Sequence, residues 1–211
     1  SSVDYTGLDS VKTINDASGF SEKITYTSPR LLGDTVGVGV QFGASYALDS
    51  KACGVDYCVR ENGKDASGAL APDLQDVFEF GVSLDRKFDN GLSVEATATY
   101  AMASEKSGIA EFDDLKALGL GMELGYEDFI LGASYLNSNN GLDNGGYLSW
   151  DAGMTWKPSQ LGFTLGYGQA KDKNIGLKSD QALFGVSYDW NEHYRLGTGV
   201  QYTRRDMPFN V

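Results

Sequence analysis

The sequence has no run of roughly 18 consecutive apolar residues, which excludes a transmembrane helix. Basic residues are also scarce: 17 Lys and Arg stand against 29 Asp and Glu, and the net charge of −12 argues against nucleic acid as a partner. Proline occurs only 4 times, whereas the chain has 27 Gly, 12 Tyr and 10 Phe, a composition that favours β structure. The 211 residues suffice for one all-β domain or one barrel.

Histidine and cysteine are nearly absent. The one histidine, His193, falls in a short predicted turn, where we expect it to be solvated. Two cysteines, Cys53 and Cys58, are too few for a structural zinc site, and the pairs Asp113–Asp114 and Asp143–Asn144 match no calcium loop. We therefore predict no metal and no cofactor. A local Cys53–Cys58 disulfide is favoured over two free thiols, which implies an oxidising compartment.

Strict alternation is the main pattern that the sequence does contain. In VGVGVQFGASYAL, residues 36–48, apolar residues alternate with residues that are mostly glycine. A period of two predicts a strand with two unlike faces. The pattern recurs and predicts ten strands, at 20–28, 36–48, 78–85, 92–100, 118–126, 129–135, 148–156, 161–167, 182–190 and 194–202.

The connections between these strands alternate in length. The short connections are 29–35, 89–91, 127–128, 157–160 and 191–193, and the long polar ones are 49–75, 103–116, 137–146 and 170–180. Antiparallel strands joined alternately by short turns and long loops are typical of an outer-membrane barrel, with short periplasmic turns and long external loops. The predicted fold is therefore an all-β transmembrane antiparallel barrel, of which about ten strands lie in this chain.

Aromatic residues on the apolar face gather at both ends of the predicted strands. The girdle near the short turns comprises Tyr26, Phe88, Tyr126, Phe129, Trp156, Trp190 and Tyr194. The girdle near the long loops comprises Tyr46, Phe78, Tyr100, Tyr135, Tyr167 and Tyr202. Two aromatic bands around an aliphatic zone suit the two headgroup layers of a membrane, so the apolar face is expected to contact outer-membrane lipid.

The opposite face is expected to line a lumen. Many of its positions are glycine, which would leave a narrow barrel poorly packed but suits a wide, water-filled one. Its charged and amide residues form the predicted pore lining: Lys23, Gln41, Glu79, Asp85, Lys87, Glu95, Glu123, Asp151, Asp189, Arg195 and Gln201. Acids outnumber bases in this set. We therefore expect a weak cation preference. The alternative, which we weigh equally, is that these acids only keep the wall hydrated and form ion pairs across strands.

The run KITYTSPRLLGDTVGVGVQFGASYA, Lys23 to Ala47, resembles the general porins of proteobacteria. The resemblance implies a 16-stranded barrel, homotrimers and diffusion of small hydrophilic solutes. It also implies that residues 1–17 are the end of an inward-folded constriction loop. Neither end of the chain looks like the end of a closed barrel, so we expect a single barrel domain over 1–211 that lacks strands on both sides. The basic cluster that such porins carry on their early strands is absent from this chain.

The predicted function is that of an outer-membrane porin, a passive diffusion channel for small polar solutes and ions. The alternative is a structural barrel, an anchor or adhesin that displays its external loops. An outer-membrane enzyme is disfavoured because the lone His193 lies at the presumed periplasmic rim, so no Ser/His/Asp arrangement can form at the external end.

Overall fold

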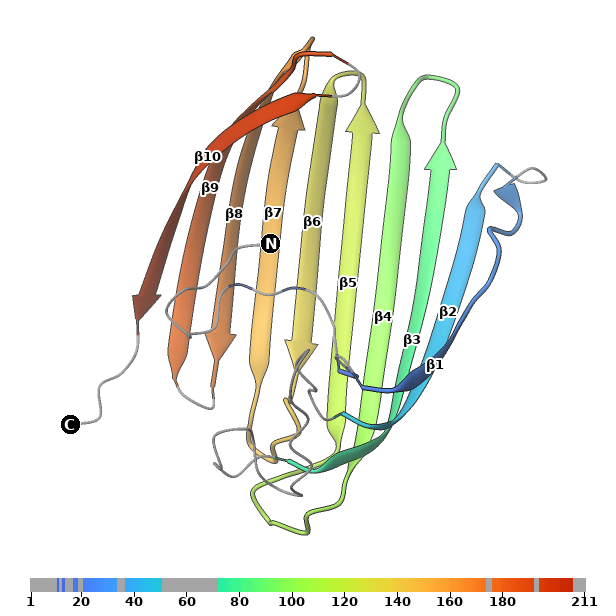
Figure 1. The fold of residues 1–211 in the computed structure, drawn as a ribbon, viewed down its shortest axis with the longest axis vertical. Helices are drawn as coiled ribbons and strands as arrows, with labels where there is room; N and C mark the ends of the chain where they lie inside the picture. Colours follow the sequence, from blue (N-terminus) through green and yellow to red (C-terminus); the bar gives the residue numbers. More distant parts are fainter. Residues whose placement is uncertain are drawn as a thin grey trace.

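The computed structural model describes residues 11, 13, 17–18, 21–33, 37–50, 72–173, 176–191 and 194–206. These residues form ten strands and one sheet, which curves at both edges (Figure 1). The strands are β1 Lys23–Thr27, β2 Gly39–Asp49, β3 Leu74–Lys87, β4 Ser93–Glu105, β5 Leu115–Tyr126, β6 Phe129–Ser138, β7 Tyr147–Trp156, β8 Leu161–Asp172, β9 Leu177–Asp189 and β10 Arg195–Asp206. No helix in the described part of the chain is long and apolar enough to cross a membrane.

The topology is a simple antiparallel meander. Each strand pairs with the next along the chain, from β1 at one edge to β10 at the other. The registers keep the two faces separate: Phe42 lies opposite Val82, and Gly43 lies opposite Gly81. All ten predicted strands are present. Their register is strongly specified, because a shift of one residue would move every apolar side chain of a strand to the polar face.

Tight turns join the strands at one end of the sheet. The turn after β3 closes with a hydrogen bond from the Phe88 amide to the Leu92 carbonyl at 2.8 Å. Gly91 adopts a φ of 86° there, a conformation that side chains disfavour. At the other end, β3 carries a bulge between Gln75 and Phe78, where Asp76 has a φ of 52°. Bulges of this kind bend and twist a strand near a barrel rim.

The strands are longer than predicted at the long-loop end. The segment 170–180 was expected to be a loop, but β8 continues to Asp172 and β9 begins at Leu177. That expectation was wrong because the outward positions of these strand ends, Lys171, Lys178 and Asp180, are polar and so resemble a loop. The inward positions Ala170, Leu177 and Ser179 are buried, so the extension is packed rather than solvated. The first strand is shorter than expected and begins at Lys23.

Buried side chains gather on the polar face in the long-loop half of the sheet. Ala47, Val77, Ala103 and Leu115 form one cluster, against which Ala17 packs. Leu136, Tyr147 and Ala170 form a second cluster, against which Val11 packs. Complete burial of Val77 contributes about 2 kcal/mol relative to an exposed valine. The described N-terminal residues Val11, Thr13, Ala17 and Ser18, called the wall-bound segment below, thus lie against the polar face.

Candidate functional site: the polar face of the sheet

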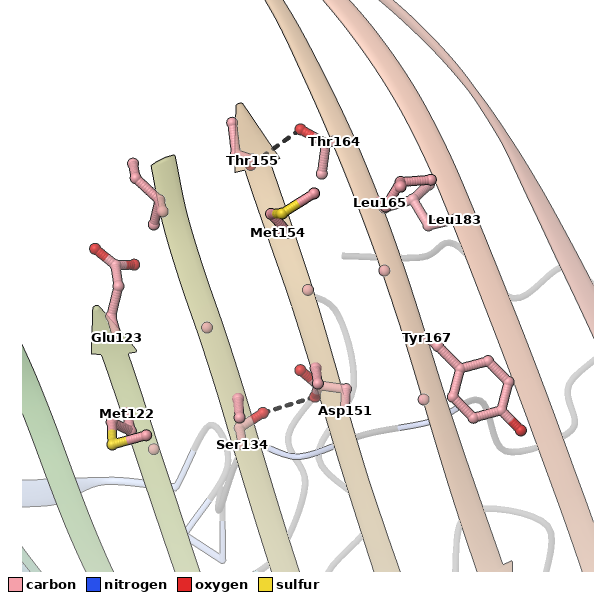
Figure 2. Close-up of a pocket in the computed structure, with 18 of the residues that line it drawn as sticks. Met122, Glu123, Ser134, Asp151, Met154, Thr155, Thr164, Leu165, Tyr167 and Leu183 are labelled. Atoms are coloured by element: carbon pink, nitrogen blue, oxygen red, sulfur yellow. Dashed lines mark hydrogen bonds between the residues drawn. The ribbon is translucent and has the colours of Figure 1, made fainter. Parts of the chain in front are cut away.

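The polar face carries a broad hollow of about 660 Å³ (Figure 2). Its floor contains Gly132, Gly153 and Gly166, which lie opposite one another on β6, β7 and β8. The hydroxyl groups of Thr155 and Thr164 lie 3.1 Å apart on one side of this floor. Because glycine adds no side chain, three adjacent strands expose their backbone here, and the wall is hollow where a packed barrel would be filled.

Two carboxylates face each other across neighbouring strands at the edge of this hollow. Glu95 on β4 lies directly opposite Glu123 on β5, which places their Cβ atoms about 5 Å apart. Both side chains are exposed, and neither forms an ion pair or hydrogen bond within the described chain. Asp85 on β3 completes the same row opposite Glu95. Glu95 and Glu123 are therefore the free acidic groups of the described wall.

Glu79 is in a different environment, although sequence placed it in the same set. Its Oε1 accepts hydrogen bonds from the backbone amides of Ala17 and Ser18, at 2.9 and 3.1 Å. Its Oε2 accepts from the hydroxyls of Ser18 and Ser45, at 2.5 and 2.9 Å. Lys23 Nζ lies 3.9 Å from the same oxygen. This carboxylate is engaged by the wall-bound segment and by β2.

Asp151 also contacts the wall-bound segment. Its Oδ2 accepts from the hydroxyls of Thr13 and Ser134, at 2.5 and 2.6 Å. Figure 2 shows Ser134 and Asp151 pointing toward each other from β6 and β7. The two attachments of the segment thus lie four residues apart in sequence, on strands four places apart in the sheet.

Ion pairs concentrate at the short-turn end of the face. Arg30, from the connection between β1 and β2, donates from Nε and Nη2 to Asp85, at 2.9 and 2.5 Å. Gly39 makes room for this pair, since a Cβ there would lie 2.2 Å from both Arg30 Nε and Asp85 Oδ1. Asp189 accepts from Lys157 and from Arg195 Nε, the latter at 2.5 Å. Two connections, those that contain Arg30 and Lys157, are tied to the wall in this way.

The other predicted pore residues also lie on strands of this face. Gln41 donates to the Ser28 carbonyl at 2.9 Å, and Gln201 lies 3.4 Å from the Thr203 hydroxyl. Lys87 is exposed at the end of β3. Sequence reasoning missed Arg30 and Lys157 because both lie in connections, where alternation assigns no face. The two cations neutralise acids that had been counted as free.

The opposite face exposes its large apolar side chains. Tyr46, Phe88 and Tyr135 are half-buried, and every other predicted girdle residue is exposed. Near the short turns, Trp156 stacks between Phe129 and Phe163, with ring centroids 6.0 and 5.8 Å away. Near the long loops, the hydroxyls of Tyr46 and Tyr167 donate to Asp76 and Asp180, at 2.7 and 2.9 Å. An aromatic ring that ends in a polar hydroxyl group suits the headgroup layer of a membrane, where one end is apolar and the other is hydrated.

Some predicted residues fall outside the described part of the chain. These are Cys53, Cys58 and His193, so the disulfide remains a prediction. Within the described ranges, no group of His, Cys, Asp and Glu side chains is arranged to hold a metal ion.

The fold is similar to a solved membrane channel. The chain matches the anion-selective porin from Comamonas acidovorans with a TM-score of 0.63 at 16% sequence identity. The match covers 92% of this chain and 55% of that one, so the chain spans about half the length of the solved porin. No curated protein matches the sequence. The family model described as Gram-negative porin matches residues 1–207, and the chain therefore belongs to this family of bacterial outer-membrane β-barrel channels.

Proposed function

We propose that the full protein is a passive diffusion channel for small hydrophilic solutes and ions, with no covalent chemistry. The hollow, polar face of the sheet is the observation that carries this proposal. It lies behind a face whose large apolar side chains are exposed, as lipid contact requires. By the family resemblance, the whole barrel has 16 strands and assembles as a homotrimer. The mass of the purified protein in detergent tests that assembly.

The N-terminal residues 1–17 are proposed to be the end of an inward-folded constriction loop. Support comes from Thr13 and Ala17, which bond to the polar face rather than to its rim. A segment held against the inner wall narrows the lumen at that level.

We propose a weak cation preference for the described part of the wall. Its support is the pair Glu95 and Glu123, which have no cationic partner in the described chain. The effect is small because Arg30, Lys157 and Arg195 offset Asp85 and Asp189. The similar solved structure is an anion-selective porin, so the sign of the selectivity has to be tested by the reversal potential of the full protein under a KCl gradient.

Planar-bilayer conductance of the full-length protein tests the channel function. A porin gives large, stable current steps that scale with salt concentration. Absent or tiny conductance in correctly folded protein would instead favour the structural barrel that anchors or displays loops.

A further inference from the structure

Glu79 and the pair Glu95–Glu123 are the same residue type on one face but in different environments. Glu79 accepts four hydrogen bonds, two of them from the backbone of the wall-bound segment. Ser18, which supplies two of the four donors, is 1% exposed. Glu95 and Glu123 have no partner in the described residues. The charge of Glu79 is also opposed by Lys23, whose Nζ lies 3.9 Å away and donates to the Ser18 hydroxyl at 2.7 Å.

We infer that Glu79 is the positioning residue of the wall-bound segment, so that it sets the bore of the pore and contributes little to its ion selectivity. The inference rests on the proposed diffusion function, and it assigns Glu79 a role in that function. Because two donors are backbone amides, the carboxylate holds the chain itself and not only one side chain. The Thr13–Asp151 contact is a second attachment, made through hydroxyl groups.

A carboxylate suits this role because it is purely an acceptor. All of its lone pairs are available to the two amides and two hydroxyls that surround it. In Glu79→Gln, one oxygen becomes an NH₂ group that faces donors and leaves at least one of them without an acceptor. Glu79→Ala removes all four acceptor contacts. Either change weakens the attachment near Ser18 while the strand pairing of β3 remains.

The experiment uses the full-length channel reconstituted in liposomes and planar bilayers. Uptake of neutral sugars of increasing size reports the bore, and the reversal potential under a KCl gradient reports selectivity. We expect Glu79→Gln and Glu79→Ala to lose the parent size cut-off and admit larger sugars, with a small change in reversal potential. The matched control Glu123→Gln removes an equal charge and should shift the reversal potential while the cut-off stays unchanged.

A cross-link provides the rescue. Ser18 and Ser45 share one oxygen of Glu79, so their side chains lie close together. In a Glu79→Ala channel that also carries Ser18→Cys and Ser45→Cys, with Cys53 and Cys58 replaced by Ser, oxidation should restore the parent cut-off. Reduction should abolish the rescue.

Two results would overturn the inference. One is a Glu79→Ala channel with the parent cut-off; the other is a cut-off that oxidation of the paired cysteines leaves unchanged. Glu79→Gln could instead shift the reversal potential as much as Glu123→Gln does and leave sugar uptake unchanged. That result would show that Glu79 contributes to ion selectivity and not to the bore. If the parent itself admits neither ions nor sugars, the diffusion function fails instead.

Discussion

Glu95 and Glu123 make an unfavourable pair that the fold retains. Like charges directly opposite each other on adjacent strands repel, and both side chains line the same hollow. Strand pairing therefore forms in spite of them. The proposed weak cation preference depends on these two carboxylates.

Replacing both residues by Gln should reduce any cation preference. The reversal potential of the full-length channel under a KCl gradient should move in the anionic direction, because the two unpaired charges are lost. Removing the repulsion should also stabilise the barrel by about 0.5 kcal/mol in urea unfolding. Asp113→Asn, in a connection outside the strands, is the matched control and should change neither quantity. An unchanged reversal potential in the double variant would locate selectivity beyond this chain.

Gly39 illustrates a close approach that alternation alone could not predict. A methyl group there would overlap Arg30 and Asp85, so Gly39→Ala should displace their half-exposed ion pair. We expect a small loss in the free energy of unfolding, because a solvent-exposed ion pair contributes little to stability. Gly197→Ala is the control, because its Cβ would meet only the Val186 carbonyl at 3.9 Å. Equal urea midpoints for the two variants would contradict this account.

At the scale of the strands, the two faces should differ in chemical access. Gly132→Cys and Gly185→Cys add a side chain where nothing lies closer than 3.8 Å, so a charged, water-soluble thiol reagent should label both. Leu131→Cys and Val186→Cys, their neighbours on the apolar face, should react only with lipid-soluble reagents. The labelling is done in native membranes with Cys53 and Cys58 replaced by Ser. Equal labelling of both sets by the charged reagent would exclude a lipid-facing apolar surface.

The sequence was sufficient to predict the strands but only part of the site. Alternation identified all ten strands because each one has two unlike faces. It failed between 170 and 180, where strands extend past the apolar zone and their outward positions become polar. It also counted Glu79 as a wetted charge, because its partners Ala17 and Ser18 are about 60 residues away in an irregular stretch. Contacts between residues so far apart in the sequence leave no periodic pattern from which they could be predicted.

For the whole molecule, the wall charge should act only over a short range. Screening shortens the range of a charge from about 10 Å at 0.1 M salt to about 3 Å at 1 M. The selectivity due to Glu95 and Glu123 should therefore fade as KCl is raised, while the sugar cut-off stays constant. Reversal potentials at a fixed KCl ratio and rising mean concentration measure the first quantity, and liposome swelling measures the second. A selectivity that does not depend on salt would point to charges buried in a narrow constriction.

The wall-bound segment crosses the polar face of the sheet. Its partner Glu79 lies in the long-loop half of β3, and Asp151 lies near the middle of β7. The buried side chains of the polar face gather in the long-loop half. Diffusive resistances add in series, so the narrowest cross-section accounts for most of the total. Under the proposed diffusion function, we expect most of the resistance to flow at the level of the wall-bound segment. Contacts of Thr13, Ala17 and Ser18 should then affect flux more than substitutions along the rest of the described wall.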